Sequence, residues 1–339
     1  MSKLSFLGIL LIIILCGCKN KNPVGAVVNV NISDSDLAFY KWKPATAPGD
    51  SSLALQFIDN MAKLCWYNPL DRIPIKDIWP DTSINQNTSL TVDVLSLNFI
   101  PKSSLSWAGI MQEFREYLSG DIDSSFCEIC IKGDEGTVHI DLGQVSEDFI
   151  PNGKLDREYF SSNDIDITDE DIGIDGMKGE DPPFLFNSHQ YATAVDGVGD
   201  PYDFWDINED GVKQLSEPWS YDDFDVSYGN DYTKINGTEG NSQLEEIDYR
   251  DTEDINCNGS LDVANNYYHI SFNLGKSHSD AQYITSGYNN PYGWYIYRIP
   301  IYICEYIGNT DIGNVEFIRI WFDDIGSETT LQIASIKFY

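Results

Sequence analysis

The chain has 339 residues, a formal net charge of −33 and a sequence pI of about 4.1. This length allows one large domain or two small ones. The strongly negative charge disfavours nucleic acid and anionic lipid headgroups as partners, because both would repel the chain.

The N-terminus has the layout of a bacterial lipoprotein signal peptide over residues 1–17. Lys3 supplies a positive start, and the apolar run that follows is about ten residues long, whereas a bilayer span needs about 20. The run ends in Leu15-Cys16-Gly17-Cys18, with a small residue directly before Cys18. We expect cleavage there, a diacylglyceryl anchor on Cys18 and a linker over residues 18–48. An ordinary secretory signal with chance cysteines is the alternative.

Residues 49–150 favour β-structure. The segment Trp107–Leu118 has a mild helical pattern, which Gly109 weakens. The other runs are short and rich in β-branched or alternating residues, as strands are: Leu53–Ile58, Leu90–Phe99, Phe126–Lys132 and Thr137–Leu142.

Residues 151–264 form an acidic middle segment. Residues 141–262 contain 32 Asp and Glu but only 6 Lys and Arg, so the segment repels itself unless cations bind to it. It is also rich in Tyr, Trp and Phe, whereas disordered segments are usually poor in aromatic residues. We therefore expect an ordered region that binds cations.

The clearest candidate cation site begins at residue 206 and matches the pattern D-x-[DN]-x-[DN]-G-x5-E of a calcium loop. Gly211 permits the sharp turn, and Pro218 argues against a helix after the loop. The pattern therefore predicts a calcium loop without flanking helices. The expected ligands are Asp206, Asn208, Asp210, the carbonyl of Val212, and Glu217.

Two weaker candidates bring the expected number of Ca²⁺ ions to between one and three. One is a shorter copy of the pattern, with ligands Asp254, Asn256, Asn258 and Asp262. The other is an acidic cluster that can equally be a solvated loop, with Asp164, Asp166, Asp169, Asp171 and Asp175. Mg²⁺ is a poorer fit, because it prefers phosphate and water ligands.

Residues 265–339 return to strand patterns, at Tyr267–Leu274, Trp294–Ile303, Val315–Phe322 and Thr330–Tyr339. Many short strands with Gly, Asn and Pro turns are typical of a sandwich. We therefore predict an all-β fold, a jelly-roll-like β-sandwich. Its halves are residues 49–150 and 265–339, and the acidic segment with its calcium loops is an insertion between them.

The five cysteines beyond Cys18 favour packing over chemistry. Cys127 and Cys130 are spaced as in redox or zinc motifs, but they lie in a strand pattern, where residues three apart face opposite sides. No second such pair and no nearby His completes a zinc site. A disulfide among Cys65, Cys127, Cys130, Cys257 and Cys304 stays open.

No motif predicts catalysis, so we expect that the chain is not an enzyme. It has four His and no G-x-S-x-G, H-E-x-x-H or P-loop pattern. Carboxylate pairs of the glycosidase type are uninformative in so acidic a chain. His139 is expected to be a surface or packed residue. The tryptophans could form a glycan-binding face, although core packing is favoured.

Several blocks of sequence, in order, resemble the SprA/Sov family of gliding-motility outer-membrane proteins, the type IX secretion translocons of Bacteroidetes-like bacteria. They include LCWYNP at 64–69, IKDIWP at 75–80, SWAGIM at 106–111 and IDLGQVSEDFI at 140–150. DIGIDG at 171–176, INGTEGN at 235–241, DTEDINCNGSLDVANNYY at 251–268 and VEFIRIWF…LQIA over 315–334 complete the series.

The resemblance implies a β-domain with an acidic insertion, similar to one repeated unit of those much larger proteins, in an outer-membrane setting. SWAGI and IRIWF…IASIKFY are also similar to galactose-binding-like carbohydrate modules. The expected function is a calcium-stabilised surface lipoprotein that binds a glycan or protein. It is expected to be anchored to the outer membrane, at the cell surface or in the periplasmic leaflet. The alternatives are an accessory part of a secretion or gliding machine, and a glycosidase.

Overall fold

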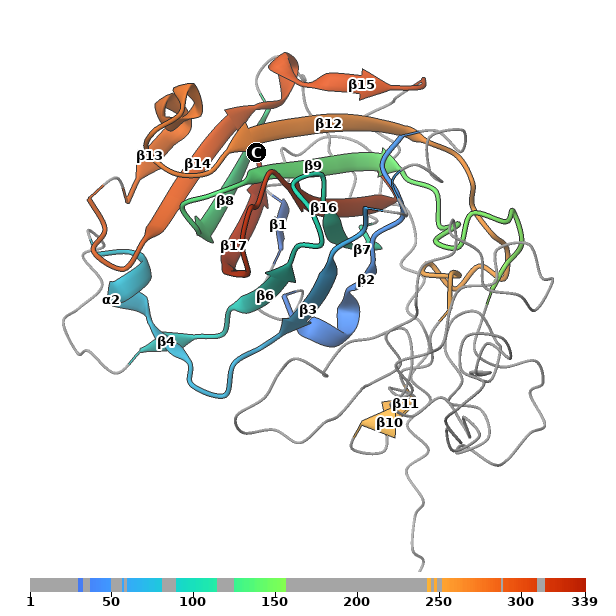
Figure 1. The fold of residues 1–339 in the computed structure, drawn as a ribbon, viewed down its shortest axis with the longest axis horizontal. Helices are drawn as coiled ribbons and strands as arrows, with labels where there is room; N and C mark the ends of the chain where they lie inside the picture. Colours follow the sequence, from blue (N-terminus) through green and yellow to red (C-terminus); the bar gives the residue numbers. More distant parts are fainter. Residues whose placement is uncertain are drawn as a thin grey trace, which may run out of the picture.

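The computed structural model consists of two large antiparallel sheets that pack against each other (Figure 1). Its described residues are 30–32, 37–49, 57, 60–80, 90–114, 125–156, 243–244, 247–248, 252–287, 289–309 and 315–339. The prediction of an all-β sandwich is confirmed.

The first sheet has seven strands. In spatial order they are β13 (Ile284–Ser286), β14 (Trp294–Pro300), β8 (Phe126–Lys132), β17 (Thr329–Phe338), β6 (Leu95–Ile100) and β3 (Lys63–Tyr67), and β1 (Val30–Ile32) also pairs with β17. Strands from before and after the acidic segment are therefore neighbours within one sheet, since β8 lies between β14 and β17.

The second sheet has six strands. Their order is β15 (Glu305–Ile307), β12 (Asn266–Asn273), β9 (Thr137–Gln144), β16 (Phe317–Asp323), β7 (Ala108–Glu113) and β2 (Lys43–Pro44). In Figure 1, β12 and β9 are long strands that run side by side, as their register requires.

Short elements complete the described part of the chain. They are the pair β4 (Ile73–Pro74) and β5 (Thr91–Val92), the pair β10 (Gln243–Leu244) and β11 (Ile247–Asp248), the helix α2 (Ile75–Ile78), and the 3-10 turns η1 (Phe39–Lys41), η4 (Ser279–Tyr283) and η5 (Ile301–Ile303). None of the described helices is long and apolar enough to cross a membrane.

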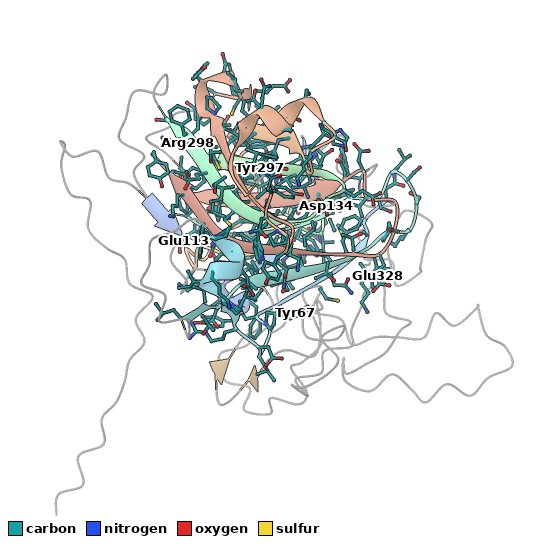
Figure 2. All side chains as sticks on the ribbon, turned by 90° about the vertical axis from the view of Figure 1, so that its left-hand side faces the viewer. Tyr67, Glu113, Asp134, Tyr297, Arg298 and Glu328 are labelled. Atoms are coloured by element: carbon teal, nitrogen blue, oxygen red, sulfur yellow. The ribbon has the colours of Figure 1, made fainter. Side chains whose placement is uncertain are left out.

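The main core lies between the two sheets and follows the two-residue period of the strands. Val138, Ile140 and Leu142 of β9 point into it, while His139 and Asp141 point to the other side of the same sheet. On β14, Tyr297 lies near the middle of the molecule and its exposed neighbour Arg298 lies nearer the edge (Figure 2).

The acidic segment joins two strands that are neighbours in the second sheet. β9 ends at Gln144, whose partner Asn266 begins β12. The chain therefore leaves the sandwich and returns to it at the same end of one strand pair.

Two expectations differ from the structure. The segment with helical character contains strand β7, because residues 107–112 are buried on both faces and tertiary packing outweighs local propensity. In addition, β1 and β2 lie within residues 18–48, which we expected to be a linker, and both strands add main-chain pairs to the sheets.

Candidate functional site

The outer face of the second sheet carries an unusual set of polar and aromatic side chains. Residues opposite each other in neighbouring strands share a face, so the register arranges this set in rows. One row contains Glu305, His269, Asp141, Arg319 and Met111. The next contains Ser271, His139, Trp321 and Gly109, and the last contains Asn273, Thr137 and Asp323. We call His139, Asp141, His269, Arg319, Trp321 and Asp323 the His–Trp cluster.

Asp141 lies at the centre of the cluster and is fully buried. Its Oδ2 accepts hydrogen bonds from Arg319 Nε at 2.7 Å and Trp321 Nε1 at 3.0 Å, and its Oδ1 contacts His269 Nδ1 at 2.6 Å. Burial opposes ionisation, but the Arg319 charge and the His269 hydrogen bond together hold the pKa of Asp141 below its ordinary value. Asp141 is therefore an ionised anchor that solvent does not reach.

Arg319 is also fully buried and connects the sheet to residues 45–49, which follow β2. Its Nη1 donates to the carbonyl oxygen of Thr46 at 3.2 Å, to Thr46 Oγ1 at 3.1 Å and to the carbonyl of Ala47 at 3.3 Å. Its Nη2 is buried without a hydrogen-bond acceptor, and the guanidinium lies 5.0 Å from the centre of the Tyr267 ring.

The rings of the cluster stack beside this charge pair. His139 lies flat on Trp321, with ring centroids 3.5 Å apart and an interplanar angle of 5°. His139 Nδ1 is 3.4 Å from His269 Nε2, and His139 Nε2 is 3.1 Å from Asp323 Oδ1. The side chains of His269, His139 and Asp323 are 19%, 11% and 33% exposed, so Asp323 is the most accessible of the three.

Gly109 allows the β16 backbone at Ile320 and Trp321 to approach β7 closely. A Cβ at Gly109 would overlap the Ile320 carbonyl and the Cβ of Trp321. The edge of the Trp321 ring also meets Trp107, with centroids 6.3 Å apart and rings nearly perpendicular. The indole is thus held in one position, which also fixes the ring stacked on it.

The end of this face around Thr137, Asn273 and Ser271, which we call the open end, is polar. Thr137 Oγ1 lies 3.3 Å from Asn273 Oδ1 and 3.2 Å from Asp324 Oδ2, and Asn273 Nδ2 donates to Asp280. Ser271 beside them is exposed. Hydroxyl, amide and carboxylate groups therefore line one edge of the stacked rings, where they can pair with a ligand that is both a donor and an acceptor.

The predicted loop at 254–262 is the one candidate cation site within the described residues. Asp254 accepts hydrogen bonds from the backbone N–H groups of Asn258 and Gly259, both at 2.8 Å. Asn256 Nδ2 and Asn258 Nδ2 both donate to Asp262 Oδ2, at 2.6 and 2.8 Å. All four predicted side chains therefore gather around one turn.

Glu147, which the sequence did not single out, lies beneath this turn. It is fully buried, and its two oxygens accept from the backbone N–H groups of Asn256 and Asp262, both at 3.1 Å. Burial raises the pKa of Glu147 to about 7 in spite of these bonds, and the charges of Asp262 and Asp254 add to the rise.

Glu253 is a second buried carboxyl next to the loop. It accepts from the backbone N–H groups of Ile150 at 2.8 Å and Asp156 at 3.0 Å. Burial, with a contribution from the nearby Asp156 and Asp148 charges, raises the pKa of Glu253 to about 9. Two buried carboxyls thus tie the loop to the end of β9.

The structure does not describe the remaining predicted site residues. Cys18, the 206 loop and the 164–175 cluster all lie outside the described residues. Within the described ranges, no group of three or more His, Cys, Asp and Glu is arranged to hold a metal ion. The 254 loop differs from such a group because half of its predicted ligands are Asn.

The cysteines and tryptophans in the described ranges mainly pack. Cys127 and Cys130 are buried on opposite faces of β8, as the strand pattern predicted, and burial raises the pKa of both thiols. The described tryptophans are buried apart from Trp79, which is half-buried. The aromatic side chains that are strongly exposed are tyrosines: Tyr40, Tyr292, Tyr302 and Tyr306.

Sequence reasoning missed the His–Trp cluster, although a signal was present. Three strands carry ionisable or polar residues at every second position within apolar runs: HID at 139–141, HIS at 269–271 and RIWFD at 319–323. This alternation marks one polar face on a sheet. It does not reveal which strands are neighbours.

No protein-family model matches the chain, and no curated protein matches it. Among solved structures, it is similar to a family 11 carbohydrate-binding module from Clostridium thermocellum in complex with a β-1,3-1,4-mixed-linked tetrasaccharide. The identity is 8%, the match covers 93% of this chain and 96% of that one, and the TM-score is 0.35. At this level the likeness does not indicate which residues of this chain would bind a ligand.

Proposed function

We propose that the protein is a non-enzymatic glycan-binding β-sandwich whose ligand lies at the open end of the outer sheet face. One observation carries the proposal: fixed, stacked rings lie beside a row of hydroxyl, amide and carboxylate groups. The C–H faces of a sugar pack on flat rings, while its hydroxyls both donate and accept hydrogen bonds. A face with both properties suits a neutral sugar better than an apolar ligand.

Asp141 favours binding over hydrolysis. A general acid must hold a proton near neutral pH and reach the bond that it cleaves. The pKa of Asp141 is lowered by Arg319 and His269, and the carboxylate is inaccessible. The residue can therefore position the rings, but it cannot protonate a glycosidic oxygen.

The test is a polysaccharide array followed by calorimetry on purified variants. We expect a selective glycan ligand and at least tenfold weaker binding after Asp323→Ala or after Ser271→Trp, which crowds the open end. Glu328→Ala is the matched control, since Glu328 directly precedes strand β17 of the other sheet and is labelled to the right of the drawn side chains in Figure 2. A blank array, or equal loss in the control, would refute the proposal.

We also propose that the loop at 254–262 binds Ca²⁺ through Asp254, Asn256, Asn258 and Asp262. Asn256 Oδ1 and Asn258 Oδ1 accept hydrogen bonds from the backbone N–H groups of Asn258 at 3.0 Å and Ser260 at 2.7 Å, and each oxygen has a second lone pair that could bind a cation together with the carboxylates of Asp254 and Asp262. Ca²⁺ prefers oxygen ligands of this kind. Its positive charge would also offset the negative charge of the buried Glu147 beside the loop.

Calcium bound only to the native protein should stabilise it by about 2.7 kcal/mol at a hundredfold excess over Kd. An Asp254→Ala, Asp262→Ala double variant should lose this loop's share of the stabilisation. Asp71→Ala, a change at an exposed acid elsewhere, should keep all of it. An unchanged calcium response in the double variant would rule out this loop. Asp206→Ala with Asp210→Ala tests the other loop in the same assay.

The anchor and its setting are proposals from the sequence. Lipidation of Cys18 would hold the protein at the outer membrane, so Cys18→Ser should release it into the soluble fraction and abolish incorporation of a labelled fatty acid. Co-purification with translocon proteins would support the accessory role in secretion, which no described contact favours over glycan binding.

A further inference from the structure

Four side chains of the His–Trp cluster form a continuous chain of hydrogen bonds across the outer sheet face. Asp141 Oδ1 contacts His269 Nδ1 at 2.6 Å, His269 Nε2 contacts His139 Nδ1 at 3.4 Å, and His139 Nε2 contacts Asp323 Oδ1 at 3.1 Å. The two histidines come from neighbouring strands and share the same face through the pairing of β9 with β12.

The number of contacts determines the number of protons. Each hydrogen bond needs one proton, so three contacts between two carboxylates and two imidazoles need three. Two neutral imidazoles carry only two. The complete chain of contacts therefore requires one additional proton, which makes the pair one shared imidazolium.

A second additional proton does not fit. It would place N–H groups on both His269 Nε2 and His139 Nδ1, which face each other at 3.4 Å. Neither nitrogen could then accept a hydrogen bond, and two positive rings would repel each other at close range. The pair must separate before it binds a fourth proton.

The charged side chains around His139 and His269 are balanced when the two imidazoles together carry one positive charge. On the same face lie Asp141 of β9, Arg319 and Asp323 of β16, and Glu305, which pairs with His269 from β15. Lys43 of β2 lies three strands beyond Asp141, beside Met111, and Asp324 lies beyond Thr137. Five buried or half-buried side chains are in direct contact: Asp141, Asp323, Arg319, His139 and His269. Their two carboxylates balance the charge of Arg319 and one imidazolium.

We propose that His139 and His269 form a proton-sharing pair that binds one additional proton, and only one, while the sheet face is intact. Acidification past this point breaks the contact between the two rings and releases His139 from its stack on Trp321. The cluster is thus an acid-sensitive switch at the open end of the face. The proposal depends only on the contacts within the chain, so it holds whether or not the face binds a glycan.

The experiment counts protons on the ring nitrogens by NMR of ¹⁵N-histidine-labelled protein without ligand. Signals are assigned with His139→Gln, His269→Gln and His278→Gln. At pH 5.5, an isolated His is about 90% charged, given its ordinary pKa of about 6.5. We expect three protonated nitrogens in the pair, with a native near-UV spectrum.

Two protonated nitrogens in the pair at pH 5.5, or four while the near-UV spectrum still shows His139 stacked on Trp321, would overturn the proposal. If the sandwich unfolds above pH 5.5, the count is made at the lowest pH with a native spectrum, and three protons are still expected there.

A second measurement compares Asp323→Asn with Glu305→Gln. Both remove one negative charge near the pair, but only Asp323 contacts an imidazole. Asp323→Asn should lower the pH at which the third proton binds, and Glu305→Gln should lower it much less. Equal shifts would mean that the proton is not held by the chain of contacts.

Discussion

Replacement of Asp141 by Asn should be among the most destabilising near-isosteric changes in the sandwich. Asp141 and Arg319 are both 0% exposed and 2.7 Å apart. Asn offers one acceptor oxygen to three donors, from Arg319, Trp321 and His269, and leaves the guanidinium charge uncompensated. Breaking such a buried pair by removing one partner costs about 3–5 kcal/mol. This is a large share of a total stability of about 5–15 kcal/mol.

The chain contains a matched control for this prediction. Arg72 and Asp93 are also 2.7 Å apart, but their side chains are 49% and 43% exposed. An exposed pair contributes about 0.2–1 kcal/mol, so Asp93→Asn should change stability by no more than that.

The assay is urea unfolding at pH 7 with saturating Ca²⁺, with the slope m checked for each variant. If Asp141→Asn is too unstable to fold, Asp141→Leu with Arg319→Met should recover part of the loss, because it removes both charges. The reasoning is wrong if Asp141→Asn and Asp93→Asn cost the same, or if Asp141→Asn costs less than about 1 kcal/mol.

Three further predictions concern other parts of the sandwich. Gly109→Ala should cost about 1–3 kcal/mol, because the added methyl meets β16 and displaces Trp321, and near-UV circular dichroism should report the displaced indole. Cys257→Asn should raise stability by up to about 1 kcal/mol in thermal unfolding, since residue 257 has a φ of 54° and Asn tolerates that region better; a lower midpoint would contradict this. Glu147 and Glu253 have pKa values raised by burial to about 7 and about 9, so the folded protein in chelator binds more protons than the unfolded chain above pH 4.5. Its stability should therefore fall as the pH rises from 5 to 9, and a flat profile in urea titrations would contradict the burial of these carboxyls.

Strand positions could be predicted well from local pattern. Phe126–Lys132 was predicted as a strand and is β8, because alternation along a half-buried strand is visible within a few residues. β7 was obscured because both of its faces are buried, so its residues do not alternate. Here the packing of Trp321 against Gly109 outweighs local propensity.

Residues of the candidate sites could be predicted where they are close along the sequence and not where they are far apart. The 254 loop could be read from the sequence because its side chains lie within nine residues and act through one turn. Its buried neighbour Glu147 could not be predicted, since it comes from a position 115 residues before Asp262.

The sequence by itself determined the all-β class and the local turn of the 254 loop, and it predicts the anchor at Cys18. These features depend on residues that are close along the chain, where periodicity and turn chemistry act directly. Only the tertiary structure decided that His139, Asp141, His269 and Arg319 form one cluster. His269 and Arg319 lie 128 and 178 positions after Asp141, and they meet it because β12 and β16 flank β9 in the sheet. Strand order depends on which sheet faces pack against each other across the whole sandwich, and no local sequence pattern specifies that order.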